Sequence, residues 1–319
     1  MSLIIREGKS IDMPAVLELL RELAILKGME DAFTLTIYDL LADGFSKKKF
    51  FTTYVAESKD EIIGVALFYA TYSKKGPSIV LEDIYINKKY DNTEIGLSIF
   101  SKFIENAEKN NINQLEWSIH ENNKKLVELH LRAGAEILYD THIYTINNIE
   151  IKKNSVKAKE FLPNEEVNIR IGKTSDMKNV LALLKEQCND KEMTCNLKIN
   201  DLINNGFSIR SYFKTFIVEK NEEIIGFLMF CHTYSSLKGR ALIIEDLFIK
   251  PKYQDKGFGK ALCYKLFEYA DKHKKMRVSQ AIHYLDKKAI KRSLENGSKR
   301  VNNMRIVQIS KETLKEFVK

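Results

Sequence analysis

The strongest constraint on this chain is an internal repeat that extends over nearly its whole length. Three pairs of segments match at offsets of 164, 162 and 163 residues: 6–20 with 170–184, 39–73 with 201–235, and 81–86 with 244–249. A repeat of this length organises the chain before any secondary structure is assigned. The sequence therefore predicts two copies of one domain.

The repeat also predicts where the chain divides. We expect a first domain at residues 1–150, a linker at residues 151–166 and a second domain at residues 167–319. The linker carries charged residues and one proline, Pro163, which breaks helices. At roughly 100 to 200 residues per domain, a chain of 319 residues is long enough for two compact cores.

Within the first copy, the hydrophobic period changes in an order that the second copy repeats. The expected elements are a helix at 12–24, a hairpin at 54–57 and 61–69, a strand at 78–86, a helix at 97–107, a strand at 114–119 and a helix at 124–131. Helices and strands that alternate in this way predict an α/β (α+β) fold, in which helices flank one central sheet in each copy.

The composition is that of a folded globular protein. Hydrophobic residues make up 44%, charged residues 29%, and only 4 residues are proline, which excludes collagen and extensive disorder. No run approaches the ~18 apolar residues of a membrane span, and no signal or transit peptide is readable at the N-terminus. We therefore expect a cytoplasmic protein with no membrane partner.

The four cysteines give no metal-binding or disulfide pattern. Cys188, Cys195, Cys231 and Cys263 all lie in the second half, without a Cys-x-x-Cys pair or alternation with histidine. We expect reduced thiols and no metal site.

Charge differs sharply between the two halves. The chain has 51 basic and 43 acidic residues, of which the first 150 residues hold 17 and 23, so the first part carries −6 and the remainder +14. An anionic ligand is therefore expected to prefer the second copy. We regard nucleic acid as an unlikely partner.

The motif that carries chemistry is the segment 253–262, which contains Gln254, Gly257 and Gly259 in the spacing Gln-x-x-Gly-x-Gly. It lies between an expected strand at 243–249 and an expected helix at 261–269. Glycines at such a junction let bare backbone N–H groups approach a pyrophosphate, and the helix N-terminus adds partial positive charge. The motif predicts a phosphate-bearing ligand, although a plain glycine-rich turn has the same letters.

The first copy departs from this motif. Asp91 stands where the second copy has Gln254, and Glu94 stands where it has Gly257. Two carboxylates would repel an anionic ligand, and the close backbone approach of the glycine is lost. We interpret the first copy as a degenerate, supporting domain.

The loop and its flanking strand resemble those of the GNAT acyl-CoA N-acyltransferases. Leu81-Glu82-Asp83 in the first copy and Ile244-Glu245-Asp246 in the second are similar to the diamine (spermidine/spermine) N-acetyltransferase branch, as is Thr233-Tyr234. The resemblance implies two tandem GNAT domains, each with a mixed sheet. It also implies acetyl-CoA as co-substrate and transfer of its acetyl group, in the C-terminal domain, to a primary amine of a polyamine, a diamine or a related small cation.

The resemblance further implies the residues that hold acetyl-CoA. The pantetheine would lie in a splay between two parallel strands and the diphosphate on the glycine loop. The implied residues are Leu247, Phe248, Ile249, Gln254, Asp255, Lys256, Gly257, Phe258, Gly259 and Lys260.

Glu245 and Asp246 are the candidates for general base and for holding the cationic amine. Because side chains alternate along a strand, at most one of them can point at the acceptor unless a bulge disturbs the pleat. Their recurrence as Glu82-Asp83 favours a functional role over a solvated strand end.

The family places a tyrosine, the general acid, four residues before the late glycine. That position is Ser293 in the second copy and His130 in the first. Ser293 is thus the candidate acid, although its hydroxyl is a poor one, and water or Tyr284 could supply the proton instead. We interpret His130 as a surface helix residue. Several basic residues lie nearby, and they form either a solvent-exposed helix face or a surface that binds the 3′-phosphate of the nucleotide. They are Lys287, Lys288, Lys291, Arg292, Lys299 and Arg300.

Three functions stay open at this point. The first is the polyamine or diamine acetyltransferase, the second an acetyltransferase for another amine such as an amino acid side chain or a peptide, and the third a non-catalytic CoA-binding module. A tandem chain could also dock its copies as a monomeric pseudo-dimer, or form a homodimer. In the pseudo-dimer, Glu30 and Asp31 would help to line the acceptor site.

Overall fold

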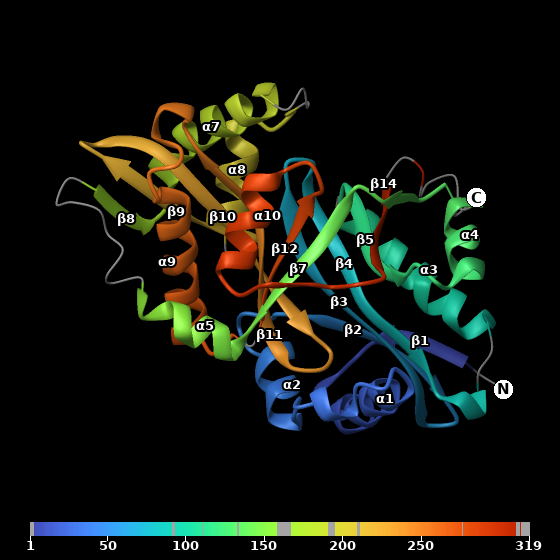
Figure 1. Cartoon of the computed structure of the whole chain (residues 1–319). Coiled ribbons are helices and arrows are strands. Elements are labelled where there is room, and N and C mark those ends of the chain that lie inside the picture. The colour runs from blue at the N-terminus through green and yellow to red at the C-terminus, as the bar shows by residue number, and fades with distance from the viewer. Residues whose placement is uncertain are drawn as a thin grey trace.

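A computed structural model describes residues 3–90, 93–110, 112–132, 134–157, 167–190, 195–208, 211–275, 277–310 and 313. These residues form two mixed sheets of seven strands, each flanked by helices, as the sequence predicts (Figure 1). In both sheets the described strands pair antiparallel except at one central parallel pair, β4 with β5 or β11 with β12. The predicted mixed α/β architecture is confirmed.

The strands of the two sheets follow matching orders. The first sheet runs β1 (Leu3–Glu7), β2 (Thr52–Ser58), β3 (Glu61–Ser73), β4 (Gly76–Ile86), β5 (Gln114–His120), β14 (Met304–Ser310) and β6 (Glu136–Leu138). The second runs β8 (Val167–Ile171), β9 (Phe213–Lys220), β10 (Glu223–Ser235), β11 (Gly239–Ile249), β12 (Arg277–His283), β7 (Thr141–Asn147) and β13 (Lys299–Arg300).

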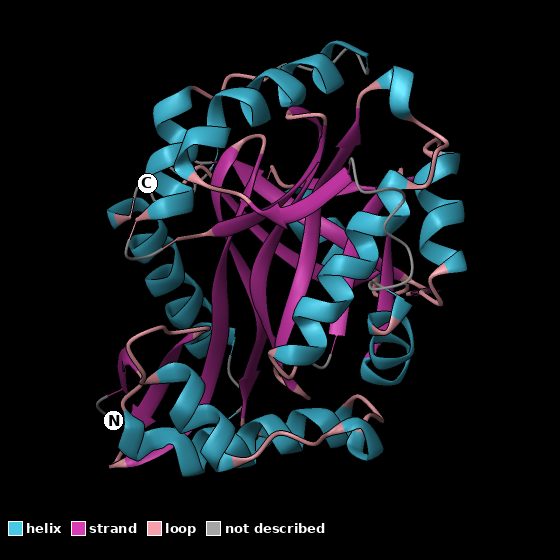
Figure 2. Ribbon diagram, turned by 90° about the vertical axis from the view of Figure 1, so that its left-hand side faces the viewer, coloured by secondary structure: helices cyan, strands magenta, loops and turns pink. Residues whose placement is uncertain are grey.

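Helices cover both faces of each sheet (Figure 2). They are α1 (Met13–Leu26), α2 (Ile37–Gly44), α3 (Thr93–Lys109), α4 (Lys124–Arg132), α5 (Asn148–Ser155), α7 (Met177–Asp190), α8 (Ile199–Phe207), α9 (Phe258–Lys272) and α10 (Lys287–Glu295). The apolar stripe of α1 is buried at Met13, Val16, Leu20 and Leu23, the helical spacing that predicted it. None of the described helices has the length and apolar character needed to cross a membrane.

The repeated residues at the start of each copy make the same contacts. Arg6 binds both carboxylate oxygens of Asp12 at 2.7 and 2.9 Å, and Arg170 binds those of Asp176 at the same two distances. Such bidentate pairs fix geometry as well as charge. This part of the repeat is therefore structural.

The two sheets exchange their last strands, which the predicted division did not anticipate. β7 from the end of the first copy pairs antiparallel with β12, and β14 from the end of the second copy pairs with β5 (Figure 1). The division at 1–150 and 167–319 therefore does not describe the sheets. The reason is physical: the alternating pattern of a strand sets which face is buried but not which of two equivalent sheets it joins.

The predicted linker at 151–166 begins inside a helix. α5 starts at an Asn147 cap, whose Oδ1 accepts from the Glu150 N–H at 3.0 Å. It packs on α9, and the Asn154 Nδ2 donates to the Asn296 carbonyl at 2.8 Å. Residues 151–155 are thus part of the second unit's helical layer, whereas Pro163 lies outside the described residues.

Each copy also inserts one tyrosine into the core of the other. Tyr72 is fully buried against Phe213, with ring centroids 4.8 Å apart, and Tyr234 is fully buried against Phe51 at 4.4 Å. Each tyrosine therefore belongs to a hydrophobic cluster of the other copy, and these contacts join the two copies together with the exchanged strands.

Candidate active site

The parallel strands of the second sheet separate part-way along their length. β11 and β12 pair from Ala241 opposite Arg277 to Ile244 opposite Gln280, and beyond this point no register joins them although both strands continue. The first sheet has the same split, where the pairing of β4 with β5 ends at Leu81 opposite Trp117. The splay implied by the family resemblance is therefore present in both copies.

A β-bulge lies where the second split opens. Met229 on β10 faces Asp246 and the next residue, Phe230, faces Ile244, so Glu245 is the extra residue on β11. A bulge re-aims neighbouring side chains, which allows both carboxylates to reach one space. The first sheet repeats the bulge at Glu82.

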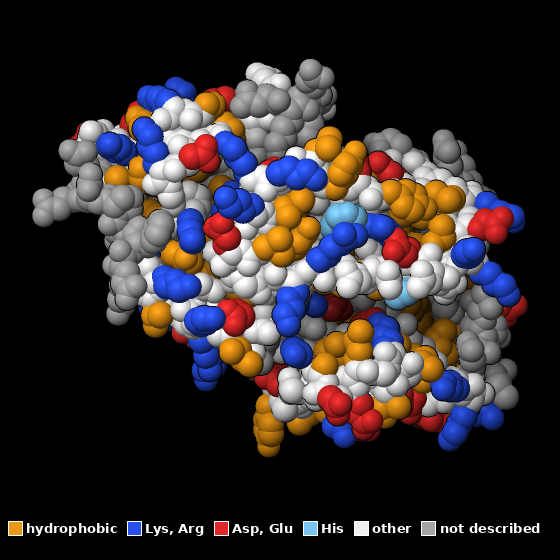
Figure 3. Space-filling view, viewed as in Figure 1, with side chains coloured by type: hydrophobic (Ala, Val, Ile, Leu, Met, Phe, Trp, Pro, Cys, Tyr) orange, Lys and Arg blue, Asp and Glu red, His pale blue; other side chains and the backbone are white. Residues whose placement is uncertain are grey.

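Both carboxylates line a large cavity between the two sheets. Its volume is about 1000 Å³, and its wall comes from both copies. Five acidic residues line this cavity: Glu82, Asp83, Glu116, Glu245 and Asp246. Five basic residues line it as well: Lys27, Lys74, Lys75, His120 and Arg277. Figure 3 shows a hollowed face with acidic side chains inside the hollow and lysine or arginine side chains at its edge.

Asp246 is held by two partners that sequence reasoning missed. The Gln187 Nε2 on α7 donates to its Oδ1 at 2.8 Å, and the Lys74 Nζ lies 3.0 Å from its Oδ2. Lys74 comes from the turn between β3 and β4, so the first copy supplies a cation to the acidic pair of the second. No short-range pattern could reveal this contact, because it depends on how the copies dock.

The surroundings of Glu245 favour its protonated form. Burial raises its pKa well above the ordinary range, and the nearby carboxylates of Glu116 and Asp246 raise it further. Burial also raises the pKa of Glu116 to about 6. A carboxylate with a raised pKa binds a proton more strongly, which suits a general base near neutral pH.

The glycine loop connects β11 to α9. Gly257 has φ +89° and caps α9, which begins at Phe258, three residues before the predicted start. Gly259 therefore lies in the first helical turn, where backbone N–H groups lack helical partners. The Gln254 Nε2 donates to the Ile249 carbonyl at 3.0 Å and so braces the loop against β11.

The surroundings of the loop suit an anionic ligand. The Arg292 Nη1 lies 3.7 Å from the point that a Cβ at Gly259 would occupy, and the Lys288 Nζ lies 2.9 Å from the Asp255 carboxylate. A helix N-terminus beside a guanidinium and an ammonium fits a diphosphate. Of the basic group left open above, Lys288 and Arg292 reach the loop, while Lys287, Lys291, Lys299 and Arg300 are exposed.

Comparison with known proteins identifies the family. The family model for the GNAT acetyltransferases matches residues 14–135 and 178–292, which is more than half of the chain. The chain belongs to the GNAT acetyltransferase family. Both matched regions lie within the repeated copies, and each contains one split and one bulge.

The curated relatives of this chain include named N-acetyltransferases. Thialysine N-epsilon-acetyltransferase from Bos taurus is 34% identical over 143 residues, which cover 42% of this chain and 84% of that protein. Spermidine/spermine N(1)-acetyltransferase-like protein 1 from Homo sapiens is 30% identical over 158 residues, covering 46% of this chain and 23% of that protein.

Solved structures share the fold over nearly the whole chain. A tandem GNAT protein from the clavulanic acid biosynthesis pathway aligns over 97% of this chain and 99% of its own, with a TM-score of 0.54 and 11% identity. A GCN5-related N-acetyltransferase from Sphaerobacter thermophilus aligns over 97% and 96%, with a TM-score of 0.56 and 12% identity. At such identities the likeness concerns the fold alone.

The predicted cofactor residues of the second GNAT domain fall into two groups. Phe248, Ile249 and Phe258 bury their side chains in the cores, so only their backbone can face a ligand. The others lie along β11 or the loop with side chains at least partly exposed: Leu247, Gln254, Asp255, Lys256 and Lys260.

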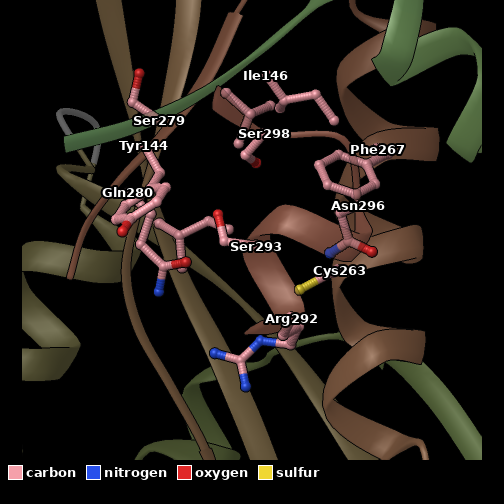
Figure 4. Close-up of a pocket in the computed structure, with 12 residues that line it drawn as sticks. Tyr144, Ile146, Cys263, Phe267, Ser279, Gln280, Arg292, Ser293, Asn296 and Ser298 are labelled. Carbon is pink, nitrogen blue, oxygen red and sulfur yellow. The ribbon is translucent and has the colours of Figure 1, made fainter. Parts of the chain in front are cut away.

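Ser293 lies on the opposite side of the second sheet from the large cavity. It lines a narrow cavity of about 10 Å³, close to the volume of one water molecule, among Gln280, Cys263 and Arg292 (Figure 4). Tyr144 from the exchanged strand β7 closes one side. Tyr284, the other candidate acid, is 45% exposed and lines neither cavity.

The first GNAT domain differs from the prediction at two places. His130 is half-buried and its Nε2 accepts from the Trp117 Nε1 at 2.9 Å, so its interpretation as a surface residue was wrong. Glu30 and Asp31 are exposed and do not line the large cavity, which Lys27 and Met29 line instead. Of the degenerate loop, Asp91 lies outside the described residues and Glu94 is exposed.

Proposed function

We propose that this GNAT protein transfers acetyl from acetyl-CoA to a primary amine of a small cationic acceptor such as a polyamine or diamine, and that the chemistry occurs in the C-terminal domain. One observation carries this proposal. The split between β11 and β12 has the glycine loop at the end of β11 and the Glu245–Asp246 pair at its opening.

The residues around the loop would hold the diphosphate of acetyl-CoA. The backbone N–H groups of Phe258 and Gly259 lie at the N-terminus of α9, and Arg292 with Lys288 supplies positive charge. The pantetheine arm would follow Leu247 to Ile249 along the unpaired edge of β11. When bound there, the thioester supplies the acetyl group at the opening of the split.

Glu245 is the group best suited to remove a proton from the acceptor ammonium. Its raised pKa makes it a stronger base than an exposed glutamate, and it lies at the opening itself. Asp246, with both oxygens already bonded to Gln187 and Lys74, is better suited to positioning charge than to taking up a proton.

The charge of the cavity supports a cationic acceptor. Glu82, Glu116 and Glu245 extend carboxyl groups into it from both copies, and relatives of this chain are named for acetylating thialysine or spermidine and spermine. The basic residues of the same cavity keep another amine, such as an amino acid side chain or a peptide, as the second candidate. A non-catalytic CoA-binding module is the third.

The first domain would serve as a structural partner rather than a second active site. The exchanged strands and the shared tyrosines support a monomeric pseudo-dimer, in which one chain provides the contacts that two subunits would otherwise make. Light scattering on the purified chain tests this, since a tight dimer of chains would contradict it. The cytoplasmic location stays a prediction.

The deciding experiment combines calorimetry with turnover. Acetyl-CoA is titrated into the full chain, and release of the CoA thiol is then followed with a panel of polyamines, diamines, lysine analogues and peptides. We expect one acetyl-CoA per chain and turnover with polyamines or diamines. Turnover only with other amines would favour the second candidate, tight binding without turnover the third, and no binding would refute the proposal.

A further inference from the structure

Positively charged side chains gather around one aromatic ring where the two copies meet. The ring is that of Phe50, which follows α2 in the first copy. The Lys275 Nζ lies 4.2 Å from the centroid of this ring, the Arg240 Cζ 4.7 Å and the Lys48 Nζ 5.8 Å. Cations at such distances are attracted to the ring, but they repel one another. None of these residues lines the large cavity between the sheets or the narrow cavity at Ser293.

Two further side chains of the second copy extend this group. His232 of β10 packs edge-on against Phe50, with ring centroids 5.6 Å apart. Lys214 of β9 has its Nζ 5.8 Å from the ring centroid of Tyr269 on α9, and the Tyr269 hydroxyl lies 3.3 Å from the His232 Nε2. We call the basic residues of this group the junction cluster: Lys48, Lys214, His232, Arg240 and Lys275.

Lys275 is the most deeply buried member of the junction cluster. It is only 3% exposed, and burial together with the charge of Arg240 lowers its pKa to about 7. The nearby carboxylate of Asp43 on α2 is already bonded to the Arg240 Nε at 2.5 Å. Among the described residues, no carboxylate lies within ion-pair distance of Lys275, Lys48 or Lys214. A buried ammonium without an opposite charge destabilises the folded chain, so the cluster has an unmet need for negative charge.

His232 adds a buried polar atom without a partner. Burial lowers the pKa of its ring to about 2, so the ring is neutral. When the Tyr269 hydroxyl donates to its Nε2, the ring hydrogen lies on Nδ1. This Nδ1 is buried and has no hydrogen-bond partner in the part of the chain that the structure describes. Because buried polar atoms are nearly always paired, a free one beside a group of cations points to a ligand that accepts hydrogen bonds.

The shared fold does not require the junction cluster. The register of the repeat is clear here, because the Lys275 N–H donates to the Ala270 carbonyl at 2.8 Å and the Ile112 N–H to the Ala107 carbonyl at 3.0 Å. At offsets of 162 or 163 residues, the counterparts of Lys214, His232, Arg240 and Lys275 in the first copy are Thr52, Ala70, Pro77 and Ile112. All four are uncharged. The same backbone therefore folds without these cations, and the cluster exists on one side of the pseudo-two-fold alone.

We propose that the junction cluster is a second ligand site, which binds a phosphate group at the junction of the two copies. A phosphate group has several acceptor oxygens and up to two negative charges, so it suits lysines and a histidine N–H that approach from different elements. Lys48 is exposed and Lys214 half-buried, and their flexible stems let both ammonium groups turn onto a ligand that enters from solvent. Lys48 comes from the first copy and the other members from the second, so the bound group would hold the copies together.

Calorimetry on the full chain tests the proposal in a Gly259→Val background, which removes the phosphate site proposed at the glycine loop. Inorganic phosphate is titrated at constant ionic strength, and adenosine monophosphate in parallel. We expect one bound phosphate group per chain. Tighter binding of the nucleotide would identify its phosphate as the ligand group, and equal or weaker binding would identify free phosphate. Absence of binding with both probes would overturn the proposal.

Two variants in the same background locate the bound phosphate. Lys275→Ile introduces the residue of the first copy, and Lys48→Ser removes an exposed charge, which covers the case in which the first variant does not fold. In each, we expect the dissociation constant for phosphate to rise at least about tenfold. Lys272→Gln is the matched control, because Lys272 is exposed at the end of α9, and it should stay within twofold. Equal affinity in all folded variants would overturn the proposal.

The pH dependence of sulfate binding gives an independent measurement, since sulfate keeps two negative charges between pH 6 and pH 8. Lys275 loses its proton over this range because its pKa is about 7, so sulfate affinity should fall about tenfold from pH 6 to pH 8. Comparison with Lys275→Ile separates this lysine from the charged and titratable groups around it: Asp43, Lys48, Lys214, His232, Arg240 and His273. A fall of the same size in Lys275→Ile would overturn the proposal. No acetyl-CoA is present, so failure of the proposed function would leave this result unchanged.

Discussion

The two GNAT domains share a backbone but differ in the residues that surround the slot beside the split. Residues 100, 117 and 130 of the first copy correspond, at an offset of 163, to residues 263, 280 and 293 of the second. In the first copy they are Phe100, Trp117 and His130, whose rings pack with centroids 5.6 and 5.2 Å apart.

The second copy has small or polar residues at the same places. Cys263, Gln280 and Ser293 leave a narrow cavity there, whereas the Trp117 indole is buried and fixed by its hydrogen bond to His130. Since both copies keep the split and the bulge, the difference concerns the space beside the split and not the fold. In the first copy, aromatic rings fill this space.

Separating the copies is the most drastic way to break the comparison. A chain limited to residues 167–319 lacks β7, and its sheet then has an unpaired gap between β12 and β13. We expect this fragment to be insoluble or unfolded, because the exposed edges of both strands and their apolar faces lose their partner. Circular dichroism and gel filtration check this.

Co-expression with residues 1–157 provides the matching control. We expect the two fragments to purify as one complex, because each supplies the strand that the other sheet needs. A fragment 167–319 that folds alone and binds acetyl-CoA would show that the strand exchange is dispensable.

The glycine loops allow a direct test of which copy binds acetyl-CoA. Gly259→Val places a branched side chain between Leu247 and Arg292, where the diphosphate would approach, and Gly96→Val is the matched change in the first copy. We expect the dissociation constant to rise at least about 100-fold in the first variant, equal to ~3 kcal/mol, and to stay within twofold in the second. Calorimetry measures both, and a reversed order would move the cofactor to the first domain.

The sequence predicts the local features of each copy, but it does not predict the contacts between the copies. The repeat follows from matching segments about 163 residues apart. The element order and the loop between β11 and α9 follow from hydrophobic period and glycine spacing, which are visible within short stretches of sequence. The partner of β7 and the contact of Lys74 with Asp246 do not, because they depend on how the copies dock. Trp117 is also invisible in advance, since an aromatic residue on a strand reads equally well as ordinary core.

The next prediction compares the glutamates at the two bulges. Glu245→Gln removes the proposed base without changing its shape, and kcat/KM should fall about 100-fold, whereas Glu82→Gln at the first bulge should change it less than threefold. The pH profile sharpens the result. Because burial raises the pKa of Glu245, the wild-type rate should increase with pH as this group loses its proton, and that increase should vanish in Glu245→Gln but not in Glu82→Gln.

The aromatic filling of the first slot predicts an effect on stability. Trp117→Gln introduces the residue of the second copy, leaves a hole beside Phe100 and deprives His130 of its donor. We expect the free energy of unfolding to fall by about 3 kcal/mol, as for other large-to-small changes of buried aromatic residues. Urea titration measures this. Acetyl-CoA should still bind once per chain, since Glu94 remains at the loop; a second bound molecule would show that the ring alone blocked the slot.

The smallest effect is expected at the position of the family's general acid. Ser293 in the second copy has a hydroxyl that holds its proton too tightly to protonate a thiolate, and its narrow cavity has room for a water molecule that could do so. Ser293→Ala should therefore change kcat by less than about threefold, because the water can remain between Gln280 and Arg292. A loss of about 100-fold would instead make Ser293 a catalytic residue. The space beside the split would then differ between the copies in chemistry as well as in size, because His130 at the matching position accepts a hydrogen bond from Trp117.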